Sequence, residues 1–304
     1  MDDVDLDPRL LRTFLAVAET LHFGRAADRL HLAQGSVSGH VRRLEDELGV
    51  ELLTRTSRSV ALTPAGAVLQ EHARRLRQAT VAAVRETRRA DRGQSGSLVV
   101  GLAAAIPLEL VAPAVAAFRE GRPDVQVELR EAPWPDPSGG LADGGVDVAF
   151  LRPPVDAAGV ALETLVVEER MALLPAGHAL AAQDALSIDD LLDETWVGSD
   201  TDPVWRAFWT AEAERGAPAR YATTISSLDG LFDAVRHAGA VGLVPASAAA
   251  RMAGAPGVAF RPVPDVAPTT IDVGWHPASE DPRVRAFVAV ARRVLRSAAV
   301  GGVD

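Results

Sequence analysis

Apolar residues recur at helical spacing through the first fifty residues. Asp7 followed by Pro8 is a typical helix start, because the carboxylate caps free backbone N–H groups and proline suits the first helical position. An apolar stripe follows at the spacing of one helix face: Leu11, Phe14, Leu15, Ala18 and Leu21. A second, short helix is predicted over residues 24–31 and a third over residues 34–48. This segment therefore predicts three consecutive helices.

The third predicted helix has one apolar and one polar face. Its apolar positions, which must pack against the first two helices, are Val37, Val41, Leu44 and Leu48. The opposite face is polar and has small residues near its N-terminus, which a recognition helix in the major groove of DNA requires. The alternative is an ordinary pair of amphipathic helices whose polar face is solvated.

A basic hairpin is predicted directly after these helices. Residues 51–55 and 59–62 predict two short strands, and the tip between them carries Arg55 and Arg58. Positive charge on a wing beside a recognition helix is suited to contacts with phosphate groups. The hairpin therefore favours DNA binding over the solvated helical pair.

A long helix is predicted next, over residues 65–90, with Thr63 as its cap and Pro64 at its first position. It carries an apolar seam: Ala65, Leu69, Ala73, Leu76, Ala79 or Thr80, and Ala83. A one-sided helix of this length is not expected to stand alone in water, so the seam predicts dimerisation. The sequence Gly-Gln-Ser-Gly at residues 93–96 predicts a flexible hinge.

Beyond the hinge, short apolar runs alternate with helical patterns. Strands are predicted over residues 98–102, 125–129, 146–151, 165–174, 195–198, 241–244 and 271–275. Helices are predicted over residues 107–120, 187–193, 203–215, 226–238 and 282–297. This alternation indicates an α/β architecture with a largely parallel sheet. Its length suggests two small lobes, with a ligand crevice at the carboxyl ends of strands.

Composition and charge narrow the chemistry. All 31 basic residues are Arg and there is no Cys, which excludes lysine-based catalysis, thiolate nucleophiles, Cys-ligated metals and disulfides. The formal net charge is −10, yet residues 24–92 carry 13 Arg against 8 acidic residues, whereas residues 93–304 carry 16 Arg against 28. This asymmetry indicates a nucleic-acid-binding part joined to a part with another task. The acidic stretch Met1–Asp5 is unlike a secretory signal, so a cytoplasmic protein is expected.

Enzymatic interpretations are weak. The sequence Gly35-Ser-Val-Ser-Gly39 has Val37 where a nucleophile elbow needs serine. The seven His residues are scattered and have no metal-ligand spacing. A triad of Ser199-Asp200 or Ser226-Ser227 with His237 is conceivable, but hydroxyl groups in a cleft fit ligand binding without chemistry. We therefore expect no catalysis, no metal and no cofactor.

Residues 10–66 resemble the LysR-type transcriptional regulators. The resemblance is carried by five runs in one register: Leu10–Glu19, Phe23–His31, Gln34–Glu45, Leu48–Arg55 and Leu62–Gly66. It continues more weakly at four later places: Pro123–Val125, Gly145–Ala149, Gly177–Leu180 and Gly242–Pro245. The family implies a winged helix-turn-helix, a long linker helix that dimerises, and a two-lobed α/β effector domain resembling periplasmic binding proteins.

The resemblance assigns ranges to these parts. The winged helix-turn-helix is expected at 1–63, the linker helix at 64–92 and the hinge at 93–96. Effector lobe I is expected at 97–160 with 278–304, and lobe II at 161–277. Dimerisation is expected to run through Leu69, Ala73, Leu76 and Ala83.

The expected DNA-binding residues lie on the helix-turn-helix and the wing. They are Arg25, Gln34, Gly35, Ser36, Ser38, Gly39, His40, Arg42, Arg43, Arg55, Ser57 and Arg58. Two positions depart from the family pattern, because Gly35 stands where Pro is usual and Gly39 where Arg is frequent. Each glycine weakens the helix by about 1 kcal/mol relative to Ala. Since Gly39 has no side chain, base reading should shift to Gln34, Ser38, His40 and the wing.

The expected effector site also departs from the family pattern. The turn after the first effector strand commonly offers a hydroxyl group in the family, but here it reads Ala103, Ala104, Ala105 and Ile106. The free N–H groups of the helix near Pro107 remain, with Arg152 as the nearby cation; the alternative for Arg152 is a surface ion pair. The remaining expected site residues are Trp134, Ser199, Thr201, Trp205, Thr223 and Ser226. Together they predict a small, largely apolar, anionic effector.

The expected partners follow from this assignment. They are double-stranded promoter DNA, a small-molecule effector, a second copy of the chain in a dimer or tetramer, and RNA polymerase, with no membrane. The alternative function is an α/β solute-binding protein or hydrolase with a helical appendage.

Overall fold

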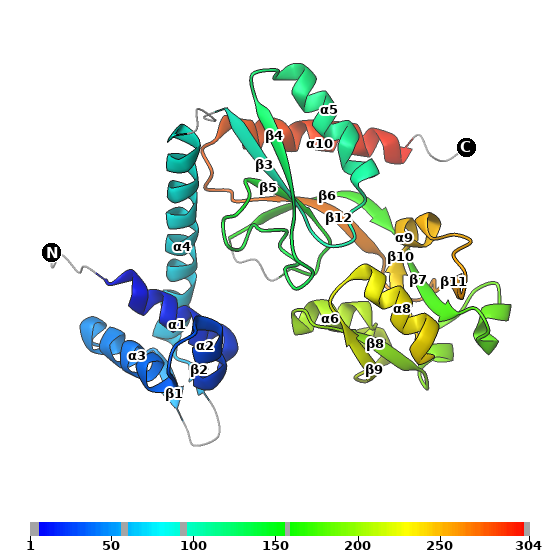
Figure 1. Cartoon of the computed structure of the whole chain (residues 1–304), viewed down its shortest axis with the longest axis horizontal. Helices are drawn as coiled ribbons and strands as arrows, with labels where there is room; N and C mark the ends of the chain where they lie inside the picture. Colours follow the sequence, from blue (N-terminus) through cyan, green and yellow to red (C-terminus); the bar gives the residue numbers. More distant parts are fainter. Residues whose placement is uncertain (1–5, 56–59, 92–95, 156–158, 301–304) are drawn as a thin grey trace. The chain divides into compact units, whose positions relative to one another are not determined.

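The computed structural model describes residues 6–55, 60–91, 96–155 and 159–300. The chain divides into two compact units, residues 1–86 and residues 87–304, which Figure 1 shows with their elements labelled. Within the described residues, none of the helices combines the length and the apolar character that a membrane span requires. Each unit has its own hydrophobic core.

The first unit is a helix-turn-helix with a wing. It contains α1 (Pro8–Thr20), α2 (Phe23–Leu30), α3 (Gln34–Leu48), β1 (Leu53–Arg55), β2 (Val60–Leu62) and the start of α4 (Pro64–Asp91). The predicted caps are present: the Arg9 amide donates to Asp7 Oδ1 (2.8 Å) and the Gly66 amide donates to Thr63 Oγ1 (3.0 Å). Strands β1 and β2 pair antiparallel, so the predicted order of elements is confirmed.

The apolar stripes of α1 and α3 meet in the core of this unit. Phe14 on α1 and Val37, Val41 and Leu44 on α3 are completely buried. The polar face of α3 is left at the surface. The spacing of the apolar residues is therefore the cause of the exposed face.

The seam on α4 is divided between two environments. Ala73 is buried in the core of the helix-turn-helix, and Leu69 packs against the same core. Leu76 and Val84, further along the helix, are 54% and 45% exposed. The unit's own core therefore covers Ala73 and covers Leu69 in part, and a place for either residue in a dimer interface stays a prediction. Ala83 lies on the exposed stretch.

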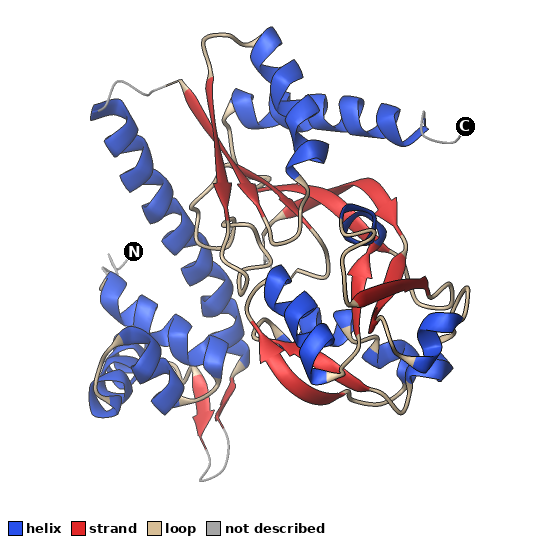
Figure 2. Ribbon diagram, turned by 45° about the vertical axis from the view of Figure 1, so that its right-hand side comes forward, coloured by secondary structure: helices blue, strands red, loops and turns tan. Residues whose placement is uncertain are grey.

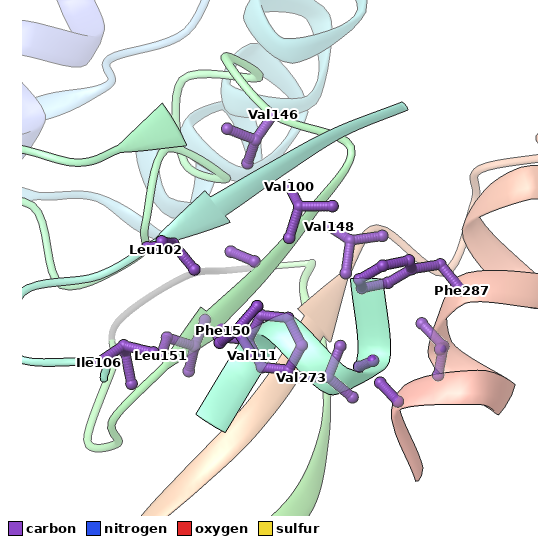
Figure 3. Packing of buried hydrophobic residues seen from close by; sticks show 14 of the residues in the cluster. Val100, Leu102, Ile106, Val111, Val146, Val148, Phe150, Leu151, Val273 and Phe287 are labelled. Atoms are coloured by element: carbon purple, nitrogen blue, oxygen red, sulfur yellow. The ribbon is translucent and has the colours of Figure 1, made fainter. Parts of the chain in front are cut away.

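The second unit contains a five-stranded sheet in the order β4-β3-β5-β12-β6. The strands are β3 (Ser97–Leu102), β4 (Gln126–Glu131), β5 (Val148–Leu151), β6 (Ala161–Glu168) and β12 (Thr269–Trp275). Helices α5 (Leu108–Gly121) and α10 (Pro282–Val300) pack side by side against this sheet (Figures 1 and 2). Figure 3 shows part of the core between these helices and the sheet, with Phe150 and Phe287 labelled. The ring centroid of Phe287 lies 6.0 Å from that of Phe150 and 5.2 Å from that of Phe118.

The second lobe is built on two smaller sheets. Strand β7 (Arg170–Pro175) lies between β10 (Gly242–Pro245) and β11 (Val258–Pro262), and β8 (Thr195–Ser199) pairs with β9 (Arg220–Ile225). The helices of this lobe are α6 (Pro203–Trp209), α7 (Glu212–Arg215), α8 (Leu228–Ala238), α9 (Ala246–Arg251) and two 3₁₀ turns, η1 (Ala179–Ala182) and η2 (Ile188–Leu191).

The sheets differ from the predicted ones in direction and in membership. Strands β3, β4 and β5 are parallel, but β12 runs antiparallel to β5 and β6, and β7 is antiparallel to both of its neighbours. The single strand predicted over 165–174 is two strands in two sheets. Because β6 and β12 pair with the five-stranded sheet, they belong to lobe I. The range predicted for lobe II, 161–277, includes both segments.

A buried arginine marks the place where the chain passes between the lobes. Arg170, the first residue of β7, donates Nε–H to the Ala267 carbonyl at 2.6 Å, just before β12. Its Nη atoms donate to the Phe208 carbonyl and to Glu214. The guanidinium also lies over the Phe208 ring, 4.1 Å from its centroid. Both passages between the lobes are therefore tied to one side chain.

Gly66 generates the first prediction. A Cβ at this position would lie 2.0 Å from the Leu52 carbonyl oxygen, whereas a Cβ at Gly39 would meet nothing within 4 Å. We expect Gly66→Ala to destabilise the first unit by about 1–3 kcal/mol, and Gly39→Ala to stabilise it by up to about 1 kcal/mol.

All five Trp residues lie in the second unit, so their fluorescence reports on that unit alone. Far-UV circular dichroism reports on both units. Gly66→Ala should lower the urea concentration at which the dichroism signal of the first unit is lost. The urea midpoint of the fluorescence transition should not change. An unchanged dichroism transition would contradict the assigned contact.

Asp272 generates a pH prediction. This residue of β12 is 5% exposed, and burial raises the pKa of its carboxyl although Thr270 and Thr164 hydrogen-bond to it. Its contribution to stability is therefore complete below the unfolded pKa of about 3.9 and is lost as the pH rises through the folded value. We expect Asp272→Asn to raise the free energy of unfolding at pH 7 and to have little effect at pH 4. Urea titrations followed by Trp fluorescence test this, with Asp229→Asn on the exposed face of α8 as control. Equal effects at both pH values would refute it.

Candidate functional site

The first candidate site is the exposed face of α3. Its surface residues are Gln34, Gly35, Ser36, Gly39, Arg42 and Arg43, with Ser38 half-buried beside them. Neither glycine would meet a neighbour if it carried a Cβ. The predicted recognition face is therefore open, and its smallest residues leave the backbone accessible.

Three of the expected DNA-binding arginines are already engaged within the unit. Arg43 Nε lies 2.8 Å from Glu47 Oε1, and this carboxylate raises the pKa of Arg43. Arg55 pairs with Glu45 (2.5 Å) and lies over the Phe23 ring. Arg25 donates to the Thr20 carbonyl (2.6 Å) at the end of α1.

Arg42 differs from these three. It is exposed on α3, and within the described residues it makes no ion pair. We therefore regard Arg42 as the most available cation on the recognition helix. Ser57 and Arg58, at the tip of the wing, lie outside the described residues.

His40 has a structural contact that the sequence does not reveal. Its Nδ1 lies 3.0 Å from Thr13 Oγ1 on α1, and the Thr13 hydroxyl donates its only proton to the Arg9 carbonyl (2.8 Å). His40 Nδ1 is consequently the donor in its contact with Thr13. This half-buried ring fastens α3 to α1, so the expectation that His40 reads a base is weakened.

The second candidate site is a pocket in the effector unit. Both lobes contribute to its lining, which includes six of the expected residues: Ala104, Ala105, Trp134, Arg152, Ser199 and Trp205. The lining does not include five others: Ala103, Ile106, Thr201, Thr223 and Ser226. Ala103 and Ile106 are buried in the core of lobe I, whereas Thr223 and Ser226 are exposed. Pro107 and Leu108 at the start of α5 do not line the pocket either, so that helix end is not the expected anion site.

Apolar residues of the second lobe complete the wall. They are Val197, Trp209, Ile225, Leu228, Leu231, Leu243 and Val244. Sequence analysis missed them because they look like any other core residue. Only Trp209, four residues after Trp205 on the same helix, carried a signal that could have been used.

Three tryptophans gather on one side of the pocket. Trp134 Nε1 donates to Ser199 Oγ at 2.7 Å, which joins the two lobes. The Trp134 ring meets Trp205 edge-on, with 5.7 Å between centroids, and Trp205 is equally close to Trp209. Edge-on contacts of this kind stabilise aromatic clusters beyond the area they bury.

Arg152 lines the pocket but is not a free cation. The side chain is 2% exposed, and its Nη2 lies 3.1 Å from Glu168 Oε2 and 3.2 Å from Ser247 Oγ. The Ser247 hydroxyl donates to the same carboxylate at 2.9 Å. Burial lowers the pKa of Arg152 against the opposing effect of Glu168. The ion pair is therefore buried, unlike the surface pair that was the alternative.

A helix-turn-helix with an open recognition face, joined to a two-lobed unit that holds a pocket, defines the class of ligand-responsive DNA-binding regulators. Comparisons with known proteins agree. Residues 8–67 match the family model described as bacterial regulatory helix-turn-helix protein, lysR family, and residues 91–296 match the LysR substrate binding domain. The chain belongs to the LysR family of transcriptional regulators.

Relatives and solved structures show the same likeness. The regulator AlsR of Bacillus subtilis is 36% identical over 189 residues, which are 62% of this chain and 63% of that protein. The Hca operon transcriptional activator HcaR of Escherichia coli is 29% identical and matches 96% of this chain and 99% of its own length. The structure of CbnR with its target DNA covers 95% of this chain and 100% of its own, at 26% identity and a TM-score of 0.51. Hydrogen-peroxide-bound OxyR of Corynebacterium glutamicum has a TM-score of 0.55 at 27% identity and covers 97% of this chain and 96% of its own.

Proposed function

We propose that the protein is a transcriptional regulator that binds promoter DNA through α3 and responds to a small molecule in the pocket between the lobes. The exposed polar face of α3, held by an apolar back inside a helix-turn-helix, is the observation that carries this proposal. The likeness to CbnR, a regulator whose structure was solved in complex with its target DNA, supports it. Action on DNA implies a cytoplasmic location.

The contacts with DNA divide into two kinds. Arg42 is proposed to contact phosphate, because it is exposed and makes no ion pair within the described residues. Gln34 and Ser38 are proposed to read base edges, since both carry hydrogen-bonding side chains on the open face of α3. Arg43 and Arg55 contribute less, because carboxylates already partly neutralise them.

The exposed part of α4 is proposed to pair with a second copy. Leu76 and Val84 are large apolar residues of α4 that are 54% and 45% exposed. Burying one Leu side chain is worth about 1.5–3 kcal/mol. A tetramer, a contact with RNA polymerase and the absence of catalysis stay predictions.

A mobility-shift experiment with the DNA upstream of the protein's own gene tests the function. The regulator should shift this fragment at a concentration that leaves unrelated DNA unbound. The alternative, a solute-binding protein or hydrolase with a helical appendage, predicts no such preference. Equal binding to both fragments would therefore reject the proposal.

Arg42 and Arg43 give a matched pair for the phosphate contact. Arg42→Ala should weaken binding about equally across DNA sequences and flatten the salt dependence by about 0.9 per recognition helix. Arg43→Ala should change the slope less, because Glu47 already engages that guanidinium. Fluorescence anisotropy at a series of salt concentrations measures both slopes. A larger change for Arg43→Ala would reverse the assignment.

Leu76→Arg should prevent pairing of the chains, because a partner helix would have to bury an uncompensated charge. Light scattering should show a smaller particle, and affinity for DNA with two half-sites should fall. Leu192→Arg places the same substitution at an exposed leucine of the effector unit and should change neither quantity. The interface is misplaced if Leu76→Arg keeps the parent's mass and affinity.

A further inference from the structure

Among the described residues, the buried side-chain atoms of the pocket lining that lack partners are all hydrogen-bond donors. Arg152 Nε, Arg152 Nη1 and Trp209 Nε1 are buried and have no hydrogen-bond partner among the described residues. Both side chains line the pocket. A buried donor without a partner costs about 1–3 kcal/mol. A ligand that offers an acceptor here would remove that cost.

The charge in the pocket is already balanced. Glu168, with a side chain 10% exposed, lies 3.1 Å from Arg152 and also accepts from Ser247. An anionic ligand would place a second negative charge near Glu168 in a region of low dielectric, where uncompensated charge is costly. Arg251 lies close enough to act on Arg152, but it is exposed, so water and salt screen it. The expectation of an anionic effector assumes a free Arg152, which the structure does not contain.

The other residues that line the pocket favour a ligand with an apolar body. The tryptophans at 134, 205 and 209 form one side, and aliphatic residues such as Leu231 and Leu243 form another. Aromatic faces and edges of this kind accommodate flat molecules. Within the described residues, the unpartnered buried side-chain donors of the pocket wall are therefore those of Arg152 and Trp209.

We propose that the effector is a neutral, largely apolar, planar molecule whose carbonyl-type acceptor binds Arg152 and Trp209. This inference rests on the proposed function and names the class of ligand for its pocket. Such a ligand satisfies the unpartnered N–H groups without disturbing the ion pair between Arg152 and Glu168.

Binding of this ligand requires the pocket to widen. The free volume is about 40 Å³, whereas ligand sites commonly measure about 300–1,000 Å³. Trp134 is the wall residue suited to move, because it is half-buried, lies in the segment between β4 and β5, and is held by one hydrogen bond to Ser199. Ligand entry therefore displaces this indole, which changes the Trp fluorescence.

Two matched pairs of probes test the class of ligand: benzamide with benzoate, and indole-3-carboxamide with indole-3-carboxylate. The full-length protein is titrated with each, followed by Trp fluorescence and by thermal shift. In at least one pair the amide should bind about tenfold more tightly than the acid. Tighter binding of the acids overturns the proposal, and so does the absence of binding by every probe at millimolar concentration.

Glu168→Gln tests the charge argument directly. It leaves Arg152 without a compensating carboxylate, so affinity for the acid should rise about tenfold while affinity for the amide stays nearly constant. An unchanged preference in the folded variant overturns the proposal.

Trp209→Phe and Trp196→Phe give a second test, which stands if Glu168→Gln does not fold. Both substitutions remove a buried, unpartnered indole N–H, but only Trp209 lines the pocket. Trp209→Phe should weaken amide binding about two- to tenfold, and Trp196→Phe should not. Equal effects of the two variants overturn the role of Trp209.

The same preparations are tested for the mobility shift. If promoter binding persists while the acids bind more tightly, the class of ligand is wrong and the regulator function stands. If the promoter shift is also absent, the proposed function itself fails.

Discussion

A guanidinium can be buried only beside a carboxylate or an equivalent set of acceptors, because its desolvation is otherwise too costly. The effector unit meets this requirement twice. Arg152 is paired with Glu168, at the end of β6, and Arg170, at the start of the next strand, is paired with Glu214. Both pairs lie where the chain leaves one sheet for another. The position of the lobes and the chemistry of the pocket therefore depend on the same kind of contact.

Strong local signals explain what the sequence predicts correctly. The caps at Asp7 and Thr63 and the apolar stripe of α3 act within a few residues, so the helices and the wing follow from pattern alone. Strand β9 carries no such signal, because five of its six residues are exposed. The passage at Glu169 lies in the charged run Glu168–Arg170 between two short apolar runs, and the single strand predicted over 165–174 passes over this break between β6 and β7.

The pocket could likewise be predicted only in part, because local sequence patterns do not reveal contacts between distant segments. The position of Arg152 directly after β5 places it correctly at the pocket, but its partners come from β6 and α9. Contacts between such distant segments leave no mark on local spacing. Positive charge in the first unit is similarly misleading when it is only counted, because Arg43 and Arg55 are bound to Glu47 and Glu45. A count from the sequence includes every charged residue. DNA interacts most strongly with the positive charges that carboxylates of the protein do not already neutralise.

Helix α4 packs against the core of its own unit through Leu69 and Ala73, and further along it presents Leu76 and Val84 to solvent. Successive residues of an α-helix are rotated by about 100°. The angle between the buried and the exposed stretch is therefore fixed by the few residues between Ala73 and Leu76. Insertion of one residue there would leave the recognition helix intact but turn the exposed stretch to another direction. The relative orientation of two recognition helices in a paired protein is thus encoded as helical phase.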